Sequence, residues 1–217
     1  MSTLKPVMNS NLSFMKRIRL AVLAAIALIS AACSTSRYVA ESTPVVDEIT
    51  LLAPYCRVNV LERDGKFYYS DSLSFIGEML IDAAIEGQGL PIRKVITVVG
   101  RSNQAALDRD YESIVDFQPG NISNTRIPST LHAFLTTNST RYALMVYSEG
   151  FVRSNPHAVL GEGQLRHASD IYLVLADVRT GRIVYFNRSR PEEGDPLSAK
   201  MISRRVKLLL EGLPIGK

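Results

Sequence analysis

The sequence lacks three features that would each assign a class of protein directly: a disulfide framework, an excess of one charge in its main body, and a long apolar run. Its 217 residues include two cysteines, which excludes a disulfide scaffold. Lys5, Lys16, Arg17 and Arg19 are the only charged residues before position 33. Without these four of the 25 Lys+Arg, basic residues only match the 21 Asp+Glu. A global basic footprint for nucleic acid is therefore absent.

The N-terminal region has the three parts of a secretory signal. A basic segment at 15–19 precedes the unbroken apolar run 20–29, and the small residues 30–32 follow it. This run is about half of the ~20 residues that a spanning helix needs, so we expect a leader rather than a permanent transmembrane anchor. We predict a signal peptide over 1–32. Because the signal is complete from Met15, translation starting there is the simpler interpretation, and a long basic region is the alternative.

The end of the leader resembles the lipobox of bacterial lipoproteins, with Ile29-Ser30-Ala31-Ala32 before Cys33. The resemblance implies that the Cys33 sulfur carries a diacylglycerol and that the new amine carries a further acyl chain such as palmitate. Each buried methylene contributes about 0.8 kcal/mol, so three chains would hold the protein on a membrane. Ser30 departs from the usual Leu, and a cleaved signal with an unmodified Cys33 is the alternative. Ser34 in place of Asp favours the outer membrane, with the protein lipid-anchored and facing the periplasm.

The rest of the chain divides into a flexible tether and one domain. Residues 33–48 are polar, rich in Ser and Thr, and interrupted by Pro44, which is typical of a linker. We predict a single α/β domain over 49–217. We expect strands at 49–60 with an edge or a bulge at Pro54, and at 67–69, 92–99, 141–152, 170–177 and 182–187. We expect helices from Ser70 or Asp71 to Glu86, over 105–117, over 128–137, and from Pro196 with Asp195 as its cap.

These elements predict a mixed sheet of about five or six strands, ending in an antiparallel C-terminal hairpin and flanked by helices on both faces. Asp64-Gly65 and Gly181 supply the turn residues of two hairpins. The nearly continuous apolar run at 92–99 indicates a central strand covered on both sides. In the last helix we expect Arg204, Arg205 and Lys207 to face solvent.

Four segments resemble, in their order, the bacterial lipoproteins related to the curli secretion subunit and to the outer-membrane activators of penicillin-binding proteins. The segments are ITLLAP (49–54), GQGLPI (87–92), ALMVYSEGFV (143–152) and IYLVLADVRTGRIVYF (171–186). The most similar piece is the turn 177–184. The resemblance implies a periplasmic domain like the anticodon-binding domain or the amino-terminal domain of TolB, and a protein that works by contact with envelope partners. The connection 154–168 is too short and polar for two membrane-spanning strands of about 9–11 residues each, so a pore is not expected.

The motifs of common catalytic sites are missing. His157 and His167 flank Glu162, but their spacing fits no compact zinc motif, and His132 falls in a predicted helix. No G-x-S-x-G elbow is present, and Gly161-Glu162-Gly163 lacks the context of a phosphate loop. We therefore predict no catalytic residue, no cofactor and no metal, with Cys33 as the one modified site.

Three further groups of side chains are ambiguous. The acidic residues Asp108, Asp110, Glu112 and Asp116 could supply a glycosidase pair, although such charges usually mark the exposed face of a helix. Cys56 favours burial, and an exposed thiol could cross-link two copies. Tyrosines in the predicted strands favour buried or half-buried positions, with an interface as the alternative; they are Tyr55, Tyr68, Tyr69, Tyr142, Tyr147, Tyr172 and Tyr185.

Together these observations predict a membrane-anchored periplasmic lipoprotein that acts as a non-catalytic binding or assembly factor in the bacterial envelope. The expected partners are the membrane, through the lipid on Cys33, and another envelope protein; a homo-oligomer stays open. The alternatives are an envelope hydrolase with a carboxylate- or histidine-based site, and a subunit of a secretion assembly.

Overall fold

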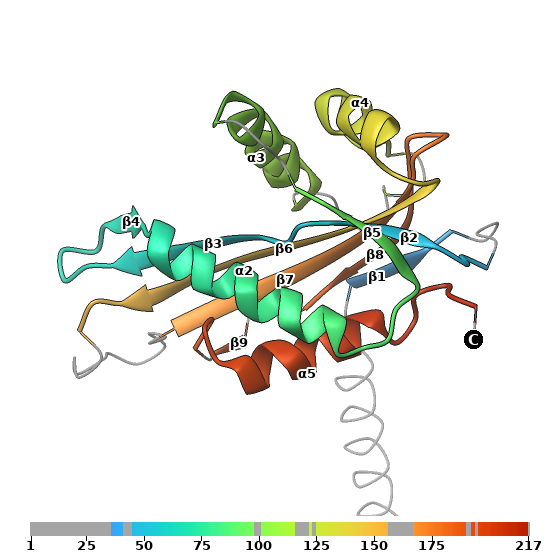
Figure 1. Ribbon diagram of the computed structural model, residues 1–217. Coiled ribbons are helices and arrows are strands. Elements are labelled where there is room, and N and C mark those ends of the chain that lie inside the picture. The colour runs from blue at the N-terminus through green and yellow to red at the C-terminus, as the bar shows by residue number, and fades with distance from the viewer. Residues whose placement is uncertain are drawn as a thin grey trace, which may run out of the picture. The chain divides into compact units, whose positions relative to one another are not determined.

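The computed structural model shows one mixed β-sheet with helices on both of its faces (Figure 1), which confirms the predicted fold class. The residues that the structure describes are 36–40, 45–97, 101–115, 122, 125–155, 167–189, 192–193 and 195–216. The sheet has nine strands rather than five or six. The excess comes from short strands that carry little sequence periodicity, and from the division of 49–60 into two strands.

The elements follow the chain in the predicted order. The strands are β1 Ser36–Val39, β2 Ile49–Leu52, β3 Tyr55–Leu61, β4 Phe67–Tyr69, β5 Ile92–Ile96, β6 Tyr142–Arg153, β7 His167–Asp177, β8 Arg182–Arg188 and β9 Glu192–Glu193. The helices are α2 Asp71–Glu86, α3 Arg101–Val115, α4 Ser129–Asn138 and α5 Ala199–Leu210.

Strand β6 lies at the centre of the sheet and pairs with β2, β3 and β7. The main strand order is β1-β8-β7-β6-β2-β5, with β3 also on β6, β4 on β3 and β9 on β7. Along one side of β6, Ala143 and Leu144 pair in parallel with β2, and Tyr147 to Arg153 pair in parallel with β3. Pro54 lies between β2 and β3, where its missing N–H cannot serve a strand ladder. The predicted single strand over 49–60 is therefore two strands, divided at Pro54.

Two hydrophobic cores lie on opposite faces of the sheet, which separates α2 and α5 from α3 and α4 (Figure 1). Side chains of β6 alternate between the two cores, as the period of a strand requires. Leu144 and Val146 enter the core under α2 and α5, whereas Ala143, Met145 and Tyr147 enter the core under α3 and α4.

Local signals placed several element ends correctly. The Ser70 hydroxyl accepts a hydrogen bond from the Leu73 N–H at 3.4 Å and caps α2. Gly65 and Gly181 have φ of 83° and 67°, which confirms both turns. Pro128 immediately precedes α4, as the sequence predicted.

Three predictions about particular segments are wrong. β5 lies at the end of the main strand order instead of at the centre, and Val95 is 55% exposed. The prediction failed because β-branched residues favour both central and edge strands. The last helix begins at Ala199, since Asp195 accepts the Leu197 N–H in a turn before it. Arg205 is buried within α5 rather than facing solvent.

The compact unit that contains the sheet spans Ser36–Lys217. β1 lies within the segment predicted as a tether and pairs antiparallel with β8 over Ser36–Val39. A strand pairs with a sheet edge through its backbone N–H and C=O groups, so a segment with polar side chains can also form one. The predicted signal peptide and Cys33 lie outside the described residues. Among the described helices, none combines the length and apolar character of a membrane span.

Candidate functional site

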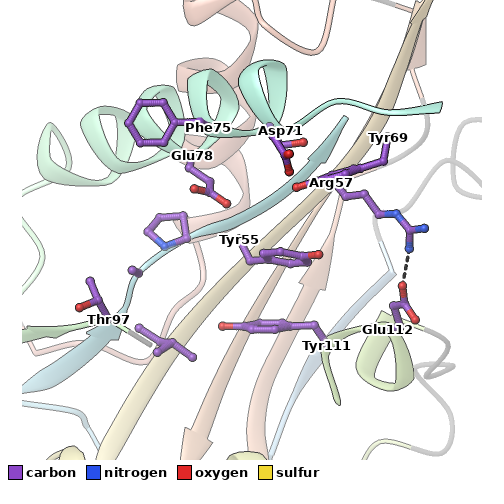
Figure 2. Close-up of a pocket in the computed structure, with 13 residues that line it drawn as sticks. Tyr55, Arg57, Tyr69, Asp71, Phe75, Glu78, Thr97, Tyr111 and Glu112 are labelled. Carbon is purple, nitrogen blue, oxygen red and sulfur yellow. Dashed lines mark hydrogen bonds and ion pairs between the residues drawn. The ribbon is translucent and has the colours of Figure 1, made fainter. Parts of the chain in front are cut away.

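A cleft of about 750 Å³ opens at the edge of the sheet where β2 gives way to β3. Tyr55 lies at its base, α2 lines one wall, and Tyr111 and Glu112 of α3 line the other (Figure 2). Pro54 is also among the lining residues. β5 pairs with β2, and β4 pairs with Asn59–Leu61 of β3. The start of β3 therefore lies between two covered stretches of edge. We call this space the edge cleft.

Side chains of α2 hold the backbone of β3 at the edge cleft. The Ser74 hydroxyl accepts the Val58 N–H at 2.9 Å, and Glu78 Oε1 accepts the Cys56 N–H at 3.4 Å. Ser74 and Glu78 are one helical turn apart and so face the strand together. These contacts replace a neighbouring strand and protect the edge from pairing with another chain.

Tyr55 and Tyr111 line the edge cleft and belong to a larger cluster of packed tyrosines. The ring centroids of Tyr55 and Tyr111 are 5.6 Å apart, and those of Tyr55 and Tyr147 are 5.5 Å apart. Tyr147 in turn lies 5.6 Å from Tyr172. One face of the Tyr55 ring rests on Tyr111, and its other face is turned toward α2 and Glu78 (Figure 2). This ring is a flat apolar surface held rigidly at the base of the cleft.

The described charges that line the edge cleft are predominantly acidic. Asp71 and Glu78 belong to α2, and Glu112 to α3. Arg57, which supplies the positive charge among the lining residues, forms an ion pair with Glu112 (Figure 2).

A row of charged side chains crosses the sheet beside the tyrosine cluster; we call Arg57, Glu149, Asp170 and Arg188 the polar row. Arg57 is opposite Glu149 on β6, and Glu149 is opposite Asp170 on β7. Asp170 accepts a hydrogen bond from Arg188 of β8 at 2.8 Å. The row lies on the same face as α3 and α4, at the end where no helix covers the described part of the sheet (Figure 1).

Two tyrosine hydroxyls tie the polar row together. Tyr172 donates to Glu149 at 3.0 Å and approaches Asp170 at 3.4 Å, while Tyr147 donates to Glu149 at 3.3 Å. Burial raises the pKa of both tyrosines, and the Glu149 carboxylate raises it further, so the hydroxyls remain hydrogen-bond donors. Burial also raises the pKa of Asp170, against the opposing effect of Arg188.

A shallower hollow of about 250 Å³ adjoins the polar row. Glu149 and Asp170 line it together with Phe67 and Phe151, whose rings meet edge to face at 5.6 Å. The Asp170 side chain is only 6% exposed, and its Oδ1 has no hydrogen-bond partner. Because this atom is itself buried, the hollow offers a ligand little access to it.

The two described histidines, His132 and His167, have separate structural surroundings. The His132 ring packs against the Gly181 turn, and its Nε2 donates to the Val178 carbonyl at 2.8 Å. His167 begins β7, and its Nδ1 is buried without a hydrogen-bond partner. His157 and Glu162 lie outside the described residues. Within the described part of the chain no cluster of three metal-ligating side chains occurs.

The acidic residues of α3 are split between two structural roles. Asp110 accepts the Leu131 N–H at 2.8 Å and caps the first turn of α4, where Pro128 supplies no side-chain cap. Glu112 pairs with Arg57. Asp116 and the side chain of Asp108 are outside the described residues.

Cys56 is buried, as predicted, and burial raises its pKa to about 12. The thiol is therefore neutral and unreactive at ordinary pH. Most strand tyrosines are buried or half-buried as expected, but Tyr68 and Tyr69 are 51% and 50% exposed on the short strand β4.

Sequence reasoning missed the edge cleft and the polar row. A local signal did exist, because Tyr55 and Arg57 share one face of β3 by alternation. The polar row needs the register of four strands, and only the folded sheet supplies it.

No protein-family model matches the chain, and no curated protein sequence matches it. Solved structures similar to it include the PelC dodecamer from Paraburkholderia phytofirmans, at 10% identity and a TM-score of 0.41, covering 85% of this chain and 99% of that one. The LpoB C-terminal domain from Salmonella enterica has 16% identity and a TM-score of 0.31, covering 71% and 88%. Lipoprotein GNA1162 from Neisseria meningitidis has 10% identity and a TM-score of 0.31, covering 77% and 98%. At these values the similarity identifies no function.

Proposed function

We propose that this chain is a lipid-anchored protein of the bacterial cell envelope that works by binding another envelope component and performs no catalysis. The observation that carries the proposal is the sequence before Cys33, in which a basic segment, a ten-residue apolar run and three small residues precede a cysteine. An acylated Cys33 would keep the domain at a membrane surface, three residues before the first described strand.

The arrangement of the edge cleft supports binding rather than catalysis. Its described lining contains no histidine or cysteine, and its one serine, Ser74, is hydrogen-bonded to the backbone of β3. Arg57 is paired with Glu112. Catalytic sites usually keep a nucleophile or base available to substrate, whereas these groups are occupied in holding the fold.

Glu149 and Asp170 are the one feature that favours the alternative of an envelope hydrolase, because they are carboxylates on neighbouring strands. Both are bound to the Tyr172 hydroxyl, and Asp170 also holds Arg188. A general acid must exchange its proton with the substrate, and a largely buried, paired Asp170 is poorly placed to do so. We therefore favour the binding role.

The anchor is tested by replacing Cys33 in the full-length chain produced in bacteria and labelled with a radioactive or clickable fatty acid. We expect the unaltered chain to carry label and to sediment with membranes, and Cys33→Ala to lose both. Cys56→Ala is the matched control, because it removes the other cysteine and should leave labelling intact. Labelled Cys33→Ala protein, or an unlabelled native chain, would refute the anchor.

The membrane and the facing side need a separate measurement. We expect the labelled chain to band with outer membranes in a density gradient and to resist protease added to intact cells, because Ser34 follows Cys33 and the domain would face the periplasm. Banding with inner membranes, or digestion in intact cells, would leave the anchor in place and refute the location.

A further inference from the structure

The outward surface of α2 is apolar, although the opposite side of the helix already covers a core of the sheet. Phe75, Ile76 and Met79 are 62%, 43% and 57% exposed, and Ala83, one turn after Met79, is exposed as well. A helix that is apolar on both sides is normally covered on both. A neighbouring group of exposed apolar side chains is therefore typical of a surface that another molecule covers.

The two helices on this face of the sheet carry opposite charges. α2 contains acidic residues and no basic one, whereas α5 contains basic residues and no acidic one. Lys200, Arg204 and Lys207 are exposed and follow the i, i+4, i+7 spacing that puts them on one side of α5. Asp82 and Glu86 are a helical turn apart near the end of α2. Within the described part of the chain, these five side chains form no ion pair or hydrogen bond, so their charges are available to another molecule.

The acidic and the basic helix lie side by side and run in the same direction (Figure 1). A Cβ on Gly77 of α2 would lie 3.8 Å from the Cδ2 atom of Leu197, which precedes α5. The stretch 204–207 of α5 is therefore at about the level of the stretch 82–86 of α2. A two-fold axis that runs between the helices, parallel to them, places α2 of each copy opposite α5 of the other. An acidic helix beside a basic one is thus a surface complementary to itself.

We propose that the outward surfaces of α2 and α5 are the interface of a homodimer, in which α2 of each copy packs on α5 of the other. The aliphatic stems of Arg204 and Lys207 cover the apolar side chains of α2, and their cationic groups reach Asp82 and Glu86 of the other copy. Long basic side chains often bury their stems on apolar surface in this way. Leu208 of α5, which is 49% exposed, adds an apolar contact. A membrane fits this surface less well, because anionic lipids repel the carboxylates of α2.

Sedimentation equilibrium of the full-length chain in a density-matched detergent tests this association. We expect a reversible dimer that separates on dilution, because the paired surface of two helices is small. Two double variants each reverse the charge of one helix: Asp82→Lys with Glu86→Lys on α2, and Arg204→Glu with Lys207→Glu on α5. Each should dimerise about tenfold or more weakly than the unaltered chain, because like charges then face each other.

Mixing the two double variants distinguishes a lost interface from a damaged fold. In the mixture, the reversed α2 of one chain faces the reversed α5 of the other, and the remaining contact joins an unaltered α5 to an unaltered α2. We therefore expect a heterodimer, and a chain with all four changes should dimerise with itself. Arg179→Glu with Arg182→Glu is the control, because it reverses two exposed charges beside the Gly181 turn, which packs against α4 on the other face of the sheet.

Several results would overturn the inference. They are a monomer at every concentration, a dimer that both double variants retain, and failure of the mixed variants to associate. A monomeric chain that binds anionic vesicles, and loses this binding in Arg204→Glu with Lys207→Glu, would make the surface a membrane contact instead. The dimer does not require acyl chains on Cys33, so sedimentation and fatty-acid labelling test the dimer and the anchor separately.

Discussion

The two faces of the sheet use charged side chains in opposite ways. On the face under α2 and α5, the charged group is internal: Arg205 is 4% exposed, and its Nη1 donates to the carbonyl and the hydroxyl of Ser169, both at 2.8 Å. On the other face, α3 and α4 leave one end of the sheet open in the described structure (Figure 1). There the polar row pairs its charges side by side across the strands.

The difference shows how one sheet provides both stability and a recognition surface. A buried guanidinium needs acceptors within the protein, and the two bonds from Arg205 Nη1 to Ser169 join α5 to β7. Charges at the open end retain partial contact with water, as the 37% exposure of the Arg188 side chain shows. Changes on the closed face should therefore act on stability, whereas changes at the open end should act mainly on binding and pH response.

The largest effect is expected at Gly77, on the closed face. A Cβ at this position would lie 2.4 Å from the Cys56 Sγ, so Gly77→Ala must push α2 away from β3. We expect the free energy of unfolding to fall by about 1–3 kcal/mol in denaturant titrations. In the Cys56→Ala background the sulfur is absent, and the same substitution should cost much less. An equal cost in both backgrounds would show that the close contact does not set the requirement for glycine.

An intermediate effect is expected at Arg205. Arg205→Met keeps much of the aliphatic packing but leaves the Ser169 carbonyl and hydroxyl without this donor. We expect a loss of about 1–3 kcal/mol of unfolding free energy. The neighbouring Arg204 is exposed on the same helix, so Arg204→Met is the matched control and should change stability by less than about 0.5 kcal/mol. Equal losses in the two variants would contradict the internal role of Arg205.

The smallest effect on stability, and a pH-dependent one, is expected at Asp170 in the polar row. Burial raises its pKa in the folded state above the ordinary 3.8, so the folded protein binds this proton more tightly than the unfolded chain does. The contribution of Asp170 to stability is therefore full below about pH 4 and is lost as the pH rises through the folded-state pKa. Relative to Asp170→Asn, the unaltered protein should lose unfolding free energy between pH 4 and 7.

Thermal and denaturant unfolding over that pH range measures the difference between the two proteins. Glu86→Gln, at an exposed position of α2, controls for the removal of one surface charge. A difference between wild type and Asp170→Asn that is constant with pH, or that grows in favour of wild type as the pH rises, would contradict the prediction.

Local patterns predicted much of the fold. The Ser70 cap and the two positive-φ glycines each depend on a few neighbouring residues, and the structure confirms them. The position of β5 could not be read in this way. An apolar β-branched strand looks the same in sequence at the centre or the edge of a sheet, and its neighbours are decided by crossovers elsewhere in the chain.

The candidate site depended on contacts between distant segments. Asp110 caps α4 from α3, and Glu112 pairs with Arg57 of β3, although both acidic residues looked like the exposed face of one helix. Arg205 was also expected to be exposed, because an arginine side chain is usually buried only where the fold supplies a hydrogen-bond acceptor. Side-chain partners of this kind carry no periodic signal in a single sequence.

The sequence by itself determined the kinds of element along the chain, because a helix cap and a turn are each specified by residues that are neighbours in the chain. The proposed membrane address also rests on the sequence alone. Only the tertiary structure decided where acidic and aromatic side chains from α2, β3 and α3 meet as the edge cleft, and how four strands align their charges in the polar row. The physical reason is that strand register and helix docking depend on the packing of the two cores as a whole, which no short stretch of residues encodes.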